Sequence, residues 1–384
     1  MTIGRHLVDR LDFSLFVREA IYGRGVTITP QTSCQMADYD DASAHVTWDD
    51  MVQTNTDVLT GREFPTKQEI ARQSMTLTYT EPRTKPNTIA GLLGLAMGGI
   101  PVATKDPNAL AYRHALSLGG ATSLPSISVR TLYDHPRYDP ETASGTVFRY
   151  DGVKVSTITL SNNGAYWQLA ATLMGSGSRP MLRVAQATAP SATPTVVEEP
   201  WLRWGDTHIY LRPLTTGRTA LSPTPIQRSA NLLGGAPSDR TIDLSCWTRS
   251  LSLTLNNNFA TDAGYRACSG VNRENLHSTR REITGEITFD VDSSFERDAI
   301  RAYMQQYNMG LEIDCAARSV MTPTSTMRYG FSILLPAARL TQITRGEQDT
   351  LENLTYAFTA LDDRVNQPMY AWAYTQRSRY LGAA

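Results

Sequence analysis

Alternating apolar and polar positions recur along this chain, and one such pattern occurs twice. Residues 75–97 begin with an alternating stretch, which predicts a strand with one buried face, and end with apolar positions at helical spacing. Residues 283–307 repeat this order, and Tyr79 then corresponds to Phe289. The repeat predicts two copies of one β–turn–α unit. Its apolar strand positions are Met75, Leu77 and Tyr79 in the first copy, and Ile283, Ile287, Phe289 and Val291 in the second.

The rest of the pattern predicts further antiparallel strands around each copy. Asp151-Gly152 and Asn162-Asn163-Gly164 are turn sequences between β-prone runs, as in hairpins. In the second half, residues 251–255 and 354–360 alternate in the same way. The fold class we expect is mainly β (α+β), with two tandem antiparallel β-sandwich or barrel domains. Each domain carries one flanking α-helix, and a linker or insertion separates the two.

A change in composition places the expected boundary between the domains. From residue 175 to 200 the chain is dominated by Gly, Ser, Ala, Thr and Pro, which is typical of a linker or long loop. We therefore expect a first domain over residues 1–180, a linker or insertion over 181–240, and a second domain over 241–384. A short strand is expected near residues 209–211 inside that linker.

Net charge and hydropathy argue against two classes of protein, general nucleic-acid binders and membrane-spanning proteins. The formal net charge of the 384 residues is −1, without the strong basic excess of a general nucleic-acid binder. The most apolar run, residues 91–103, is shorter than the ~20 residues of a membrane span and contains Gly and Pro. Charged residues between positions 9 and 19 interrupt any signal-peptide core. We expect no membrane segment.

No pattern of catalytic residues stands out. The six histidines are scattered, and Cys34, Cys246, Cys268 and Cys315 form no CxxC pair. The densest acidic cluster could bind calcium, could supply a glycosidase-type carboxylate pair, or could be a solvated loop. The sequence predicts no enzymatic activity, no metal and no cofactor. The cluster consists of Asp38, Asp40, Asp41, Asp49 and Asp50.

The order of these elements resembles the tail tube proteins of long-tailed bacteriophages, in particular those with a duplicated tube domain. The resemblance extends over roughly three hundred residues and weakens over residues 176–240. Its segments are Arg18-Glu19-Ala20-Ile21-Tyr22-Gly23 with Pro30, residues 88–98, Tyr112-Arg113-His114, Leu124-Pro125-Ser126, residues 152–160, 280–292 and 351–363.

This resemblance implies a structural virion protein that polymerises as stacked rings into a hollow tail tube, which conducts DNA into the host cell. Single-domain members form six-subunit rings, so a duplicated chain implies a trimeric, pseudo-hexameric ring. The implied partners are other copies of the chain, the tape measure, terminator and baseplate proteins, and transient double-stranded DNA in the lumen. The protein would lie in the host cytoplasm before assembly and in the virion tail afterwards.

The resemblance implies a role for each of two groups of residues. The polar strand positions would face the lumen: Thr76, Thr78, Thr80, Thr284, Glu286, Thr288 and Asp290. The long polar stretch 257–279, with a counterpart at 59–68, would make the ring-to-ring contact, be mobile in the free protein and become ordered in the tube. Its candidate contact residues are Asn257, Tyr265, Arg273, Glu274 and Arg280.

Two other readings stay open at this point. One is a different virion component, such as a tail terminator, baseplate or decoration protein, which copy number in the particle would distinguish. The other is a β-sandwich carbohydrate-active enzyme that uses Asp49, Asp50 or Glu63, for which carboxylates converging in a cleft would be evidence.

Overall fold

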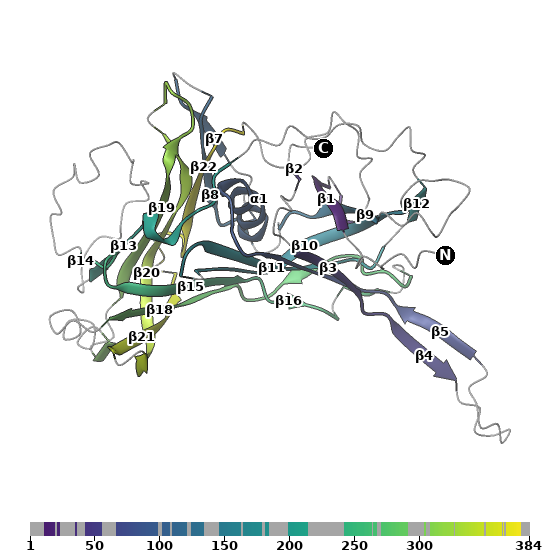
Figure 1. Ribbon diagram of the computed structural model, residues 1–384. Coiled ribbons are helices and arrows are strands. Elements are labelled where there is room, and N and C mark those ends of the chain that lie inside the picture. The colour runs from purple at the N-terminus through teal and green to yellow at the C-terminus, as the bar shows by residue number, and fades with distance from the viewer. Residues whose placement is uncertain are drawn as a thin grey trace, which may run out of the picture.

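The fold is mainly β in the computed structural model of the chain (Figure 1). Antiparallel pairings join most described strands into one connected system, while β4–β5 and β16–β17 form separate two-stranded ribbons. The structure describes residues 11–19, 21–23, 35–36, 43–55, 67–98, 102–107, 110–120, 124–133, 146–162, 164–178, 181–183, 199–213, 242–262, 264–266, 270–290, 303–304, 308–325, 327–348, 351–362, 364 and 366–377.

The elements divide at residue 200 into two series. The first is β1 (Leu11–Arg18), β2 (Gln35–Met36), β3 (Ser43–Trp48), β4 (Met51–Asn55), β5 (Lys67–Arg72), β6 (Met75–Glu81), α1 (Pro86–Met97), β7 (Val102–Lys105), β8 (Tyr112–Ser117), β9 (Ile127–Tyr133), β10 (Thr146–Asn162), β11 (Trp167–Gly175) and β12 (Met181–Arg183). The second is the 3₁₀-helix η4 (Trp204–Asp206), β13 (Thr207–Pro213), β14 (Ile242–Asp243), β15 (Thr248–Asn256), β16 (Phe259–Ala260), β17 (His277–Ser278), β18 (Glu282–Asp290), β19 (Met309–Val320), β20 (Arg328–Gln348), β21 (Leu351–Ala360) and β22 (Tyr370–Thr375).

The strand pairings of the first series recur in the second. In the first, β2 pairs with β1, β1 with β9, and β9 with the start of β10. The end of β10 pairs with β11, β11 with β6, and β6 with β3. The second series repeats both runs of pairings. It joins β14 to β13, β13 to β19, and β19 to the start of β20. It then joins the end of β20 to β21, β21 to β18, and β18 to β15. Also, β12 lies beside the start of β10 as β22 lies beside the start of β20.

The register irregularities recur as well. The β10–β11 pairing shifts between Val155 and Thr157, and the β20–β21 pairing shifts between Leu340 and Gln342. Because bulges place a local kink at one defined position, their repetition fixes the alignment of the two series residue by residue. Leu173 then corresponds to Phe358, and through it Tyr79 corresponds to Ile287. The sequence alignment of Tyr79 with Phe289 is therefore displaced by two residues, which leaves each side chain on the expected face.

Two strand pairings connect the series, β8 with β22 and the end of β10 with β15, and the second of these joins their sheets into one row. The end of β10 lies between β11 on one side and β15 on the other. The result is a continuous row of strands in the order β3, β6, β11, β10, β15, β18, β21 and β20. We call this row the long sheet. Its apolar side forms the core, which contains buried residues from both series.

Helix α1 is buried on all sides between the long sheet and β8 and β22 (Figure 1). Pro86 lies inside its first turn, where the missing N–H costs nothing. No side chain of the N-cap residue caps the helix, and the carboxylate of Glu199 instead accepts the Asn87 backbone N–H at 2.8 Å. Gly98 ends the helix in the left-handed conformation with φ 82°.

Two predictions from the sequence have different outcomes in the structure. The strand expected near residues 209–211 is confirmed as β13, which pairs with β19 and so belongs by pairing to the second series rather than to a linker. The second helix, expected over residues 295–307, lies almost wholly outside the described residues, as does the stretch 59–66. The division into two separate domains stays a prediction.

Candidate assembly surface

The polar side of the long sheet gathers the expected lumen-facing residues. Met75, Leu77 and Tyr79 of β6 are buried, whereas the alternating residues Thr78 and Thr80 are exposed and Thr76 is half-buried. Strand β18 alternates in the same way, with Glu286 exposed. Opposed residues of an antiparallel pair lie on the same side of a sheet. A line of such pairs runs from β6 to β18 through Thr80, Ala170, Thr159, Thr254 and Thr284, so both groups share one face.

Short hydroxyl side chains dominate this polar face. Thr159 Oγ1 and Thr254 Oγ1 are 2.9 Å apart across the β10–β15 pairing, and Thr288 Oγ1 and Thr355 Oγ1 are 2.9 Å apart across β18–β21. Its acidic groups include Glu286 and Asp290, and Asp290 forms an ion pair with Arg249. The face is therefore polar but carries little net charge.

The two outermost strands of the long sheet expose unlike edges. Strand β3 pairs with β6 on one side, and the last residues of β20 pair with β21 on one side. Within the part of the chain that the structure describes, no other strand lies along the opposite edge of either stretch. Trp48 at the end of β3 is 49% exposed. Open strand edges of this kind are templates for pairing with another chain.

A two-stranded arm, β4 and β5, projects from the molecule where β3 ends and β6 begins (Figure 1). Val52 and Ile70 lie opposite each other on the arm, and both are exposed, as is Met51. Apolar side chains on a projecting ribbon favour a contact with another molecule. The sequence pattern predicted a contact only over residues 59–68, and these apolar positions were not part of that prediction.

The expected ring-contact stretch packs against the base of this arm. The Gln73 backbone N–H donates to Val271 O at 2.7 Å, and Tyr265 Oη donates to Gln73 O at 2.8 Å. The Arg72 guanidinium lies 4.9 Å from the centroid of the Tyr265 ring and 3.4 Å from Asp262 Oδ1. We call residues 257–280 the brace, because its contacts hold the arm to the second series.

The structure separates the five expected ring-contact residues into two groups. Asn257 is fully buried, and its Nδ2 donates to Ala96 O at 3.0 Å and to Val155 O at 2.8 Å. Arg273 is also buried, with Nη1 3.3 Å from Gly175 O, and Tyr265 is engaged with the arm. These three side chains make contacts inside the chain. Glu274 and Arg280 are exposed at the surface, and their role in a contact stays a prediction.

Arg281 closes the end of α1. Its guanidinium donates to Ala96 O at 2.8 Å, Met97 O at 3.0 Å, Gly119 O at 2.8 Å and Asn257 Oδ1 at 2.8 Å. A cation at the C-terminus of a helix also meets the negative end of its dipole. Burial lowers the pKa of Arg281 to about 10, which leaves it charged at neutral pH.

A second buried polar group links β10 to the brace. Lys154 Nζ donates to Asn275 Oδ1 at 3.0 Å and Leu276 O at 3.1 Å, and it lies 5.0 Å from the Tyr22 ring centroid. Burial lowers the pKa of Lys154 to about 8, partly offset by the charge of Glu19. Burial also raises the pKa of Glu19, against hydrogen bonds that include Gly152 N–H at 2.9 Å. No sequence motif marks these distant groups.

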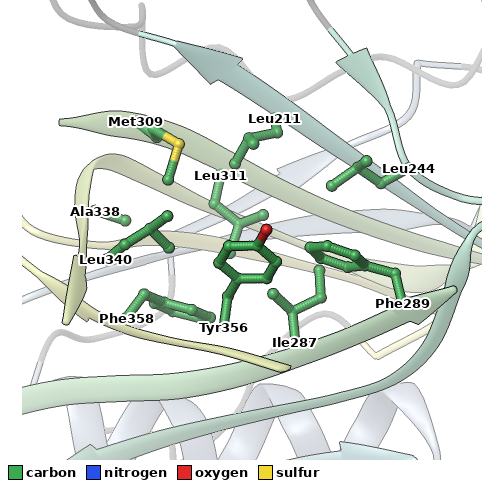
Figure 2. Close-up of a pocket in the computed structure, with 10 residues that line it drawn as sticks. All are labelled: Leu211, Leu244, Ile287, Phe289, Met309, Leu311, Ala338, Leu340, Tyr356 and Phe358. Atoms are coloured by element: carbon green, nitrogen blue, oxygen red, sulfur yellow. The ribbon is translucent and has the colours of Figure 1, made fainter. Parts of the chain in front are cut away.

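The second series encloses an apolar pocket (Figure 2). Tyr356 and Phe289 stack there with ring centroids 4.8 Å apart. No carboxylate, histidine or thiol is among its described lining residues, and the hydroxyl of Tyr356 is the one polar side-chain group there. The lining is Leu211, Leu244, Ile287, Phe289, Met309, Leu311, Ala338, Leu340, Tyr356 and Phe358.

The acidic cluster of the sequence analysis is only partly within the described residues. Asp38, Asp40 and Asp41 lie outside them, and so does Glu63. Asp49 accepts a hydrogen bond from Thr76 Oγ1 at 3.2 Å and lies at the start of the arm. Among described residues, no three His, Cys, Asp or Glu side chains are grouped so that they could hold a metal ion.

No family model matches the chain, and no curated protein matches it. Separately, none of the helices in the described part of the chain has the length and hydropathy to cross a membrane.

Proposed function

We propose that this protein is a structural subunit of a bacteriophage tail tube, made of two tandem tube domains. One observation carries the proposal: two copies of the same four-stranded row lie edge to edge in one sheet, β3-β6-β11-β10 followed by β15-β18-β21-β20. The first copy presents β3 and the second presents β20. A repeated unit with unlike ends extends by adding further copies head to tail.

Such a head-to-tail contact closes into a ring when the rotation between units is suitable. Closure removes both open edges of every chain, which is how β-barrels avoid edge-to-edge aggregation. Three chains would contribute about twenty-four strands, and with ~4.8 Å spacing and ~40° tilt these close at a backbone radius of about 24 Å. That radius leaves an aqueous channel wide enough for duplex DNA.

The polar face of the long sheet suits the inside of such a channel. The opposite side is apolar and forms the core of the chain, so it cannot face water. Threonine hydroxyls with a few acidic groups hold no array of cations for phosphate. Since phosphate neutralisation by Lys and Arg supplies most non-specific DNA affinity, this face would let DNA slide.

The arm and the exposed part of the brace would then join one ring to the next. They lie together at one end of the long sheet, and the arm carries exposed apolar side chains. The tape measure, terminator and baseplate proteins remain the expected partners at the tube ends. As a tube subunit the protein would be abundant in the virion, which separates this role from that of a terminator, baseplate or decoration protein.

Negative-stain electron microscopy of the purified protein at high concentration tests the proposal. The expected result is hollow, regularly striated tubes or closed rings with three chains in each ring. Protein that stays monomeric at high concentration, and also when incubated with isolated tail-initiation complexes, contradicts it.

A further inference from the structure

The pairing of β10 with β15 inside one chain is a template for a pairing between chains. Its register is explicit, with Ile158 opposite Leu255, Thr159 opposite Thr254 and Leu160 opposite Leu253. Both strands have a counterpart in the other series. The counterpart of β10 is β20, and the counterpart of β15 is β3, so the two open edges of the long sheet correspond to the two edges already joined.

The correspondence can be followed residue by residue. Ile158 follows the bulge of β10 and lies opposite Ala171, and Ile343 follows the bulge of β20 and lies opposite Tyr356. Thr159 is therefore equivalent to Thr344. In the same way, β3 and β15 are aligned through their pairings with β6 and β18. Thr47 opposite Thr76 corresponds to Thr254 opposite Thr284.

We propose that the end of β20 in one copy of this chain pairs antiparallel with β3 of a second copy in the register of the β10–β15 pairing. The inference rests on the proposed ring assembly and specifies its contact. Thr344 lies opposite Thr47 of the next copy, which reproduces the Thr159–Thr254 pair. The other predicted pairs are Gln342 with Asp49, Ile343 with Trp48, Arg345 with Val46 and Gly346 with His45.

We call the β10–β15 pairing the internal joint and the pairing of β20 with β3 of the next copy the proposed joint. Burial at the internal joint supports the proposed register. Ile158 and Leu255 are 1% and 2% exposed where β10 meets β15. Their counterparts in the open edges, Ile343 and Trp48, are partly and largely exposed. Pairing in the proposed register would bring these two side chains together on the apolar side of the sheet. A slip by one residue would turn them to the polar face, so the hydrophobic pattern opposes it.

One apolar pair of the internal joint has a charged residue in its place at the proposed joint. Leu160 and Leu253 are both buried at the internal joint, whereas Arg345 and Val46 occupy the equivalent positions. Arg345 is 3.4 Å from Glu352 Oε1 in an exposed ion pair. A charged residue on a sheet edge is a common barrier to unspecific strand pairing. The internal joint forms during folding and needs no such barrier.

Disulfide trapping tests the register. Thr47→Cys and Thr344→Cys are prepared as separate proteins, mixed and oxidised under mild conditions. Directly opposed residues of an antiparallel pair have Cα atoms about 4.5–5.5 Å apart, within the range that a disulfide bridges. We expect a covalent dimer in the mixture and none from either variant alone, because the contact joins unlike edges. A protein carrying both changes should give a ladder that ends at the trimer.

Three controls keep the test decisive. The pair His45→Cys with Thr344→Cys is displaced by two residues and should form far less dimer. Thr159→Cys with Thr254→Cys in one chain should form an internal disulfide, which verifies that oxidation reports strand register. The parent chain measures any background from the native cysteines, of which Cys246 is exposed.

The outcomes separate this inference from the proposed function. If rings or tubes form but only the displaced pair, or neither pair, crosslinks, then the register is wrong and ring assembly stands. Dimers from one variant alone would reveal a two-fold contact and overturn the register. If no rings form and no pair crosslinks, both the register and the proposed function fail.

Discussion

Gly285 of β18 lies directly opposite Phe358 of β21, and a Cβ atom at Gly285 would overlap the Phe358 ring. The equivalent pair in the first series is Leu77 with Leu173. One series thus fills the space with two leucines and the other with an aromatic ring over a glycine. Such exchanges of size between neighbours keep the packing density of the core.

This size exchange predicts strong coupling between the two positions. Gly285→Leu should destabilise the protein by at least about 1–3 kcal/mol, because it overpacks a filled site. Adding Phe358→Leu should recover part of the loss by recreating the Leu77–Leu173 pair. The remainder persists because Ser252 O also lies near the new Cβ atom. Urea unfolding of the wild type, both single variants and the double variant measures the coupling; additive effects would contradict the argument.

Arg281 and Arg280 form a matched pair for testing the closure of α1. Arg281 makes four hydrogen bonds through its guanidinium, while the neighbouring Arg280 is exposed. Arg281→Met should cost about 2–4 kcal/mol, since it leaves helix-end carbonyls unsatisfied. Arg280→Met should change the free energy of unfolding by less than about 0.5 kcal/mol. Equal effects of the two variants in urea unfolding would refute this role.

His114 predicts a loss of stability in mild acid. Burial lowers the pKa of His114 from its usual 6.5, and its Nε2 lies 2.7 Å from Arg377 O. The unfolded chain binds a proton near pH 6.5 while the folded chain does not. The stability that neutral His114 contributes to the folded protein is therefore fully present above pH 6.5, and it is lost as the pH falls through the lowered pKa. His114→Gln should reduce the pH dependence of urea unfolding between pH 7.5 and 5, and an unchanged pH dependence would contradict this role.

The charge of the polar face should control DNA retention in assembled tubes. Glu286→Lys should leave tubes intact, bind duplex DNA at low salt and slow DNA ejection, because each ring gains cations that neutralise phosphate. Glu286→Gln is the matched neutral variant and should bind far less. Asp290→Lys should add to the effect, but it also breaks the ion pair with Arg249. DNA that passes the Glu286→Lys tubes normally, with no retention at low salt, would place Glu286 away from the lumen.

The arm should be needed for stacking rather than for ring closure. Ile70→Lys, opposite Val52, puts a charge on the exposed apolar side chains of the arm. We expect single rings without tubes by negative-stain microscopy. Leu110→Lys, an equally apolar and more exposed position outside the arm, should still allow tubes. Long tubes from the Ile70→Lys protein would exclude the arm from the ring-to-ring contact.

A larger change separates assembly from folding at the brace. Deleting residues 260–276 should leave folded protein that cannot form tubes, although the lost contacts of Tyr265 and Arg273 with the arm and β11 should also lower its stability. Far-ultraviolet circular dichroism reports the fold and microscopy reports the tubes. Tubes from the deleted chain would disprove the role of the brace.

Local pattern predicted much of this structure. The alternation around Tyr79 and Ile287 identified β6 and β18 and the face that each buries, because the two-residue period of a strand is visible in the sequence. Asp151-Gly152 did not form the expected simple turn. Instead β10 continues through it with a register shift, and Gly152 takes φ 67°. A turn sequence inside a long strand often marks a bulge.

Contacts between distant segments were beyond the sequence. Asn257 reads as a polar loop residue, yet it is buried because Ala96 and Val155 supply carbonyl partners for its amide. Glu199 accepts the N–H of Asn87 from more than a hundred residues away. Such partners depend on how strands from separate parts of the chain pair, and no local pattern encodes that. The open edges of β3 and β20 likewise became visible only once every other pairing was known.

Strand β22 lies between β8 and β20, so it is a central strand that is translated late. Helix α1 packs against it, and Ala371 and Ala373 are buried there. While residues 370–375 are still inside the ribosome, β8 and the start of β20 each lack a neighbour on that side. Unpaired strand edges make nascent chains prone to aggregation. Synthesis order therefore delays completion of the fold until the second series has emerged, and the nascent chain is a candidate for chaperone protection.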